Sequence, residues 1–154
     1  MKPGLKYLQL FEDRLESLRK LVDLGLADEA TEKIFRYMEK GRKDDLWLSR
    51  TGITGLPDGL EVGGDLFLDG CDRLQSLPED LQVRGLLSLE GCISLTHLPD
   101  GLRVGGSLYL NECTGLTRLP ENLWVGEWLH LTDSGIDRVP ASAEVKGRII
   151  GLKK

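Results

Sequence analysis

The chain has 154 residues, of which 40% are hydrophobic and 29% are charged, and its formal net charge is −5. This length suits one compact domain or one short repeat array. No apolar run approaches the about 20 residues that a membrane-spanning helix needs, so no membrane partner is expected. Acidic residues near the N-terminus interrupt the apolar core that a cleavable secretion signal requires.

Charge is divided unevenly along the chain. Residues 1–43 carry 10 Lys+Arg and 8 Asp+Glu, net +2, whereas residues 44–154 carry 10 and 17, net −7. An acidic region repels phosphate backbones, so no nucleic acid is expected as a partner. Three cysteines without a secretion signal indicate reduced thiols and a cytoplasmic location. The alternative is an exported effector that carries no cleavable signal.

The N-terminal part has the period of helices. Apolar residues recur at steps of three and four in two stripes, with Gly25 between them. The stripes are Leu8, Phe11, Leu15, Leu18 and Val22, then Ala27, Ala30, Ile34, Tyr37 and Met38. Two antiparallel helices ending at Gly41 are therefore predicted. Residues 1–43 are assigned as a helical hairpin that caps the following array, with a targeting or partner-binding hairpin as the alternative.

The rest of the chain repeats itself. A Leu-x-Leu motif begins at 46, 66, 87, 108 and 129, and a partial sixth copy begins at 149. Five of the six prolines fall in one column, and all three cysteines, Cys71, Cys92 and Cys113, fall in another. A fixed period of this kind predicts a solenoid. Residues 44–154 are therefore assigned as a repeat array.

Each repeat is predicted to form one turn of such a solenoid. Leu87 and Leu89 alternate with polar neighbours, which predicts a short strand with its leucines inward. Pro99 then begins an extended return segment, because proline fixes φ and cannot donate to a ladder. One turn buries too little to fold alone, so stacked turns are the stable unit.

The pattern Leu-x-Leu-x-x-Cys-x-x-Leu at 66–74, 87–95 and 108–116 resembles the leucine-rich repeat. The Leu-Pro-x-x-Leu that follows, for example at 98–102, is similar to the short bacterial class found in effectors. The resemblance covers residues 46–152. It implies an α/β solenoid, a leucine-rich repeat horseshoe with a concave parallel β-sheet and an N-terminal helical cap.

No arrangement of residues indicates catalysis. His97 and His130 have no evident nucleophile with a third orienting group, and the chain has no phosphate-binding P-loop. Cysteines spaced by 21 residues without partner histidines do not match a zinc site. The cysteines are instead expected to form a buried row whose thiols meet loop carbonyls. We expect no enzyme activity, no metal and no cofactor.

Three rows of variable residues are expected on the concave face. The central row is Trp47, Phe67, Ser88, Tyr109 and His130; the preceding row is Asp45, Asp65, Leu86, Ser107 and Trp128; the following row is Ser49, Asp69, Glu90, Asn111 and Thr132. Exposed aromatic side chains flanked by acids have the composition of a protein-binding hot spot. The alternative is that the rings only shield the sheet.

The rows therefore predict a non-catalytic interaction module that binds a protein or peptide, with a basic partner favoured by the acids. The residues expected to contact it are Trp47, Phe67, Asp69, Glu90, Tyr109, Asn111, Trp128 and His130. Trp124 lies on the return side, and no role is assigned to it. The resemblance also implies an alternative function, the substrate-recognition part of a bacterial effector or ubiquitin-ligase-type system whose catalytic domain is absent from this chain.

The C-terminal edge of the array leaves three alternatives open. The sixth copy begins a strand and then reaches Lys153 and Lys154. The two lysines could protect the open edge and keep the protein monomeric, two chains could pair there as a weak dimer, or a further domain could follow.

Overall fold

The computed structural model describes residues 13, 16–17, 19–20 and 28–153. The chain divides into two compact units, Met1–Gly41 and Arg42–Lys154. Within the first expected helix, residues 13, 16–17 and 19–20 are described and are helical, whereas its apolar stripe, Leu8, Phe11, Leu15, Leu18 and Val22, lies outside the described residues. None of the helices among the described residues is long and apolar enough to cross a bilayer.

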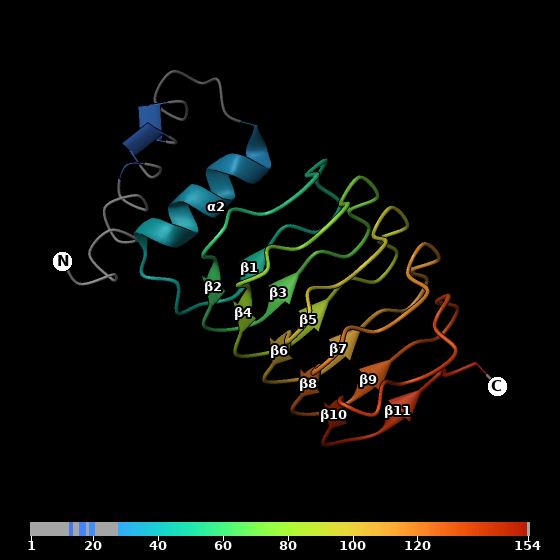
Figure 1. Ribbon diagram of the computed structural model, residues 1–154. Helices are drawn as coiled ribbons and strands as arrows, with labels where there is room; N and C mark the ends of the chain where they lie inside the picture. The colour runs from blue at the N-terminus through green and yellow to red at the C-terminus, as the bar shows by residue number, and fades with distance from the viewer. Residues whose placement is uncertain (1–12, 14–15, 18, 21–27, 154) are drawn as a thin grey trace. The chain divides into compact units, whose positions relative to one another are not determined.

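Helix α2 (Glu29–Glu39) belongs to the first unit (Figure 1). It begins after Asp28, whose carboxylate accepts a hydrogen bond from the backbone N–H of Thr31 at 2.8 Å. This hydrogen bond lowers the pKa of Asp28, because it stabilises the charged carboxylate. The buried side chains of α2 are Ala30, Ile34, Phe35, Tyr37 and Met38. The helix predicted by the second stripe is therefore confirmed over these residues.

The second unit is a parallel β-solenoid of about five turns. Its first sheet has six parallel strands, and each lies beside the strand one repeat earlier (Figure 1). The strands are β1 (Leu46–Trp47), β3 (Leu66–Phe67), β5 (Leu87–Ser88), β7 (Leu108–Tyr109), β9 (Leu129–His130) and β11 (Ile149–Ile150). Every Leu-x-Leu motif thus starts a strand, as predicted, and the partial sixth copy supplies the last one.

A second parallel sheet runs along the return segments. Its five strands are β2 (Glu61–Val62), β4 (Gln82–Val83), β6 (Arg103–Val104), β8 (Trp124–Val125) and β10 (Glu144–Val145). The sequence predicted only an extended return here, because the proline in each repeat cannot donate a hydrogen bond. Pairing begins four residues after that proline, where the backbone amides are free to donate, as from Arg84 to the Val62 carbonyl at 2.9 Å.

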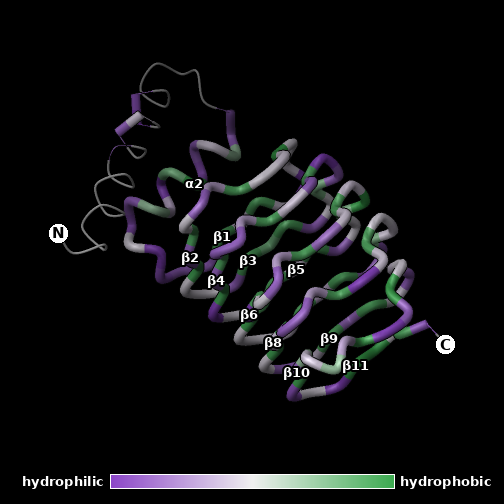
Figure 2. Tube along the Cα trace, in the orientation of Figure 1, coloured by the Kyte–Doolittle hydropathy of each residue, from purple (hydrophilic) through white to green (hydrophobic). Residues whose placement is uncertain are grey.

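Inward side chains of both sheets fill the interior of the solenoid. The two leucines of each complete motif are buried, and so are the valines of β2, β4, β6 and β8. In the first and fifth turns, which are one residue shorter, Ile53 and Ile136 occupy the place of a buried leucine. Figure 2 shows the hydrophobic residues recurring at corresponding positions of successive turns. The interior therefore continues from turn to turn, so a single turn has no core of its own.

Backbone geometry at two corners constrains the residue types. After each of the first five strands of the six-stranded sheet, one residue has the left-handed backbone conformation, with a positive φ. These residues are Arg50, Gly70, Gly91, Glu112 and Asp133. At the corner after β6, a Cβ on Gly105 would collide with the carbonyl oxygen of Arg84 in the turn before. Adjacent turns approach so closely at Gly105 that a side chain would require a shift of the backbone, although the same column holds Arg84 and Lys146 in other turns.

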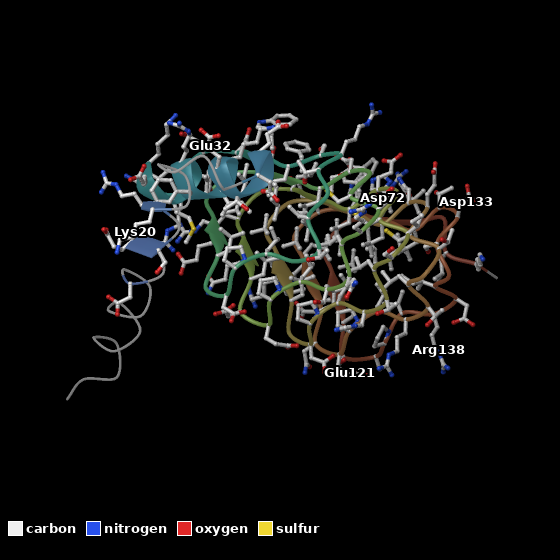
Figure 3. All side chains as sticks on the ribbon, turned by 90° about the horizontal axis from the view of Figure 1, so that it is seen from above. Lys20, Glu32, Asp72, Glu121, Asp133 and Arg138 are labelled. Atoms are coloured by element: carbon white, nitrogen blue, oxygen red, sulfur yellow. The ribbon has the colours of Figure 1, made fainter. Side chains whose placement is uncertain are left out.

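The two kinds of loop lie on different sides of the solenoid. Asp72 and Asp133, which follow strands of the six-stranded sheet, lie on one side in Figure 3, and Glu121 and Arg138, which precede strands of the five-stranded sheet, lie on the other. Among the described residues, β11 is the edge strand of the six-stranded sheet beside β9, and Ile149 is 40% exposed.

Candidate functional site

The central row lies on the outer face of the six-stranded sheet. Strand pairing sets Trp47 opposite Phe67, Phe67 opposite Ser88, Ser88 opposite Tyr109, and Tyr109 opposite His130. The leucine on either side of each of these residues points into the core and is buried. Alternation along each short strand thus places the variable side chains together on one surface.

The rings of the central row form two face-to-face stacks. The centroids of Trp47 and Phe67 are 3.9 Å apart with 9° between the ring planes, and those of Tyr109 and His130 are 4.2 Å apart, also at 9°. Parallel strands lie about 4.8 Å apart, so in-register rings are held at nearly stacking distance. Trp47 remains 58% exposed at the end of its stack.

Ser88 separates the two stacks. It is only 6% exposed, and its hydroxyl donates a hydrogen bond to Oδ1 of Asp69. Ser49 donates to Oδ2 of the same carboxylate at 3.3 Å. Asp69, which the sequence assigned to partner binding, therefore also links three neighbouring turns of the solenoid.

Side-chain oxygens of the preceding row accept hydrogen bonds from the backbone of the next turn. Oδ1 of Asp45 accepts from the amide of Asp65 at 2.7 Å, and Oδ1 of Asp65 accepts from the amide of Leu86 at 2.7 Å. The hydroxyl of Ser107 accepts from the amide of Trp128 at 3.2 Å. These residues extend the sheet's ladder by one bond, a role that the sequence did not reveal. The sequence feature that could have indicated this role is a short side chain with an oxygen acceptor, Asp or Ser, directly before a strand.

The other assigned residues in the following row differ in what they contact. Oδ1 of Asn111 accepts a hydrogen bond from the amide of Thr132 at 3.0 Å, so its carboxamide is partly used within the protein. The side chain of Glu90 is exposed. Glu90 is therefore the acid on this face that is most available to a partner.

A third aromatic side chain lies beside the second stack. The centroids of Trp128 and His130 are 6.0 Å apart, with the ring planes tilted by 35°, and Trp128 is 45% exposed. The guanidinium of Arg148 lies 5.8 Å from the centroid of the Trp128 ring. Nε2 of His130 is buried with no hydrogen-bond partner among the described residues. Trp128 and Arg148 thus add an aromatic ring and a cation beside the second stack.

The three thiols point inward and meet backbone carbonyls, as predicted. Sγ of Cys71 donates to the Leu48 carbonyl at 3.1 Å, and Sγ of Cys92 donates to the Leu68 carbonyl at 3.1 Å. Burial raises the pKa of Cys92 to about 12 and that of Cys113 to about 11. Thiols with such pKa values stay protonated at neutral pH, so they are poor nucleophiles and poor metal ligands. No three potential metal-ligating side chains cluster among the described residues.

One aromatic contact lies away from the central row. The guanidinium of Arg103 lies 4.6 Å from the centroid of the Trp124 ring, on the outer face of the five-stranded sheet. No role was predicted for Trp124. The signal was present, because Arg103 and Trp124 occupy one column in consecutive repeats and in-register pairing brings that column together.

The fold and the variable face together define a repeat protein, a parallel β-solenoid with strands about 21 residues apart. Comparison with protein-family models, with curated proteins and with solved structures found no match for the chain.

Proposed function

We propose that this protein is a non-catalytic interaction module that binds a protein or peptide on the outer face of its six-stranded sheet. In this proposal the array is a leucine-rich repeat horseshoe, this face is its concave side, and the helical segment of the first unit is its N-terminal cap. The observation that carries the proposal is the row of stacked aromatic rings. Large rings on this face have no part in filling the core, which the leucines already fill.

Two features of the face support a binding role. Stacked rings are rigid, so little side-chain entropy is lost when a partner covers them. Trp47 and Trp128, near opposite ends of the central row, retain large exposed apolar areas that a partner would bury. Aromatic anchors of this kind account for most of the binding free energy at many interfaces.

The charge on the face favours a basic partner. Glu90 is exposed beside the gap between the stacks, and the residues of the array carry a net charge of −7. Opposite charge on the partner would accelerate association and add specificity. Binding should therefore weaken as the salt concentration rises.

The test replaces rings of both stacks in the full chain. Wild type, a Trp47→Ala/Phe67→Ala/Tyr109→Ala variant and an Ile93→Ala control are used as baits, and captured proteins are identified by mass spectrometry. Ile93 is 54% exposed but lies in a loop after β5, away from the central row. The partner is then purified, and its dissociation constant is measured with each bait.

We expect the control to bind like wild type and the triple variant to lose at least about 30-fold in affinity, equal to about 2 kcal/mol for a hot spot. Equal affinity for all three proteins would exclude this face as the binding site. Circular dichroism spectra of the three proteins would show whether each variant keeps its fold.

A further inference from the structure

An open cavity of about 470 Å³ lies on the outer face of the five-stranded sheet. It extends over β4, β6 and β8, which are neighbouring strands in Figure 1. Its lining includes Gln82, Arg84, Arg103, Gly105 and Trp124. This volume falls within the range of small-ligand sites. The cavity belongs to the other sheet from the central row, so inferences about it do not rest on the proposed function.

At one corner of the cavity, the third turn has a glycine where the second turn has Arg84. This column holds Arg84 in the second turn, Gly105 in the third and Gly126 in the fourth. A Cβ on either glycine would collide with a carbonyl oxygen of the turn before it. Close packing of the backbone thus keeps the corner beside Arg84 free of side chains.

The cation in the cavity is held in place by an aromatic ring. Gln82, Arg103 and Trp124 stand side by side on paired strands, and the guanidinium of Arg103 lies 4.6 Å from the centroid of the Trp124 ring. A cation above an indole ring is attracted to its π face, and the contact restricts a flexible side chain. Arg103 is thus partly ordered before any ligand arrives.

The arginines that line the cavity have no carboxylate partner. Neither Arg84 nor Arg103 forms an ion pair with any residue that the structure describes. Asp80 also lines the cavity, but its Oδ1 accepts a hydrogen bond from the amide of Gly59 at 2.9 Å. Gly59 precedes β2, so this carboxylate is directed away from β6 and β8. Glu79 is the other acid of the lining.

We propose that Arg84 and Arg103 form a binding site for the phosphate group of a small phosphate monoester. A phosphate monoester carries a charge of nearly −2 at neutral pH and three strong acceptor oxygens, which match two guanidinium groups. A carboxylate carries only one charge and would leave one arginine uncompensated. Arginine is suited to the role, because its planar fork donates two parallel hydrogen bonds to an oxyanion.

Backbone and arginine side-chain N–H signals of the ¹⁵N-labelled full chain report on this site. The chain is titrated at pH 7.5 and constant ionic strength with inorganic phosphate, phenyl phosphate or acetate. We expect saturable shifts at Arg84, Arg103 and the indole N–H of Trp124 with both phosphate ligands. Tighter binding of phenyl phosphate than of inorganic phosphate would identify an esterified ligand, and equal binding would identify the free ion.

Three variants separate a site from general attraction to positive charge. Arg84→Gln and Arg103→Gln should each weaken phosphate binding by about tenfold or more, because each removes a charge-assisted contact. Arg138→Gln is the matched control, since Arg138 is exposed and does not line the cavity. Shifts that do not saturate, equal binding of acetate, or unchanged binding in both cavity variants would overturn the proposal.

Discussion

The interior of the solenoid and the outer face of its six-stranded sheet follow opposite rules. Inside, successive turns repeat the same residue types, such as Cys71, Cys92 and Cys113 in one buried column. On the outer face, the central row changes from a tryptophan to a serine to a histidine. An interior side chain packs against the turn before it and the turn after it, so few alternatives fit. An outward side chain meets neighbours on one side only and is free to change with function.

The largest expected effect comes from placing a charge inside. Leu89 is fully buried, so Leu89→Asp would leave a carboxylate without a partner among leucines. We expect a loss of at least about 4 kcal/mol in the free energy of unfolding, enough to unfold a marginally stable array. Urea denaturation followed by circular dichroism measures it.

Ile93→Asp is the matched control, because it makes the same kind of change in the same turn at a side chain that is 54% exposed. This variant should stay within about 0.5 kcal/mol of wild type. Similar losses in the two variants would mean that the contrast between interior and surface is absent.

The buried thiols give the interior a pH dependence. Burial raises the pKa of Cys92 from about 9.0 to about 12, so the folded protein keeps this proton after the unfolded chain has lost it. The unfolded state then binds fewer protons, and stability falls as the pH rises from about 9 to about 12. Each such thiol contributes a slope of up to about 1.4 kcal/mol per pH unit.

Urea midpoints of wild type and of a Cys92→Ser/Cys113→Ser variant, measured from pH 8 to pH 11, test this slope. The serine hydroxyl can still donate to the carbonyl but does not titrate in this range. The variant should lose less stability than wild type as the pH rises. Parallel curves for the two proteins would show that the thiols do not contribute.

On the outer face, the expected effects on stability are smaller. A double-mutant cycle with Trp47→Ala and Phe67→Ala measures the coupling of the first stack. We expect a coupling free energy of about 1 kcal/mol, because a stacked aromatic pair adds about that much stabilisation beyond the contribution of its buried area. The matched cycle with Trp47→Ala and Tyr109→Ala should show almost no coupling, since the two rings belong to different stacks. Coupling of equal size in both cycles would contradict two separate stacks.

The smallest expected effect concerns the turn after each strand. Gly91 has a φ of 74°, and an added Cβ would make only ordinary contacts at 3.8 Å. Gly91→Ala should therefore cost about 1 kcal/mol from backbone strain alone. Gly91→Asn should cost less, because asparagine adopts this conformation more readily. An equal loss in both variants in thermal unfolding would indicate a steric cause instead.

Much of the fold could be predicted from the sequence, because equivalent positions in the five repeats occupy the same structural environment. The strands at each Leu-x-Leu motif and the buried cysteines follow from period and polarity alone. The five-stranded sheet was not predicted. The proline in each repeat lacks a backbone N–H and so argued against a strand, but the residues that follow it have amides that can pair.

The candidate site was predictable in its location but not in its internal contacts. Sequence periodicity places Trp47 and Phe67 on one face, but only the paired strands show that their rings stack. Ser88 was counted among the outward residues, yet it is buried and bonded to Asp69. Hydrogen bonds between turns depend on side-chain direction, which a repeat pattern does not encode.

The one-residue difference between turns has a consequence for how such a protein can change. Steps of 20 and of 21 residues both leave the strands paired in register, as at Leu46 with Leu66 and at Leu87 with Leu108. A gene that duplicated or deleted one complete copy would therefore lengthen or shorten the coil without disturbing the remaining pairs. Such an event in the third turn, which holds Ser88 between the two stacks, would move the stacks apart or together by about 4.8 Å. Recombination, or a protein engineer, could thus adjust the reach of this surface in whole-coil increments.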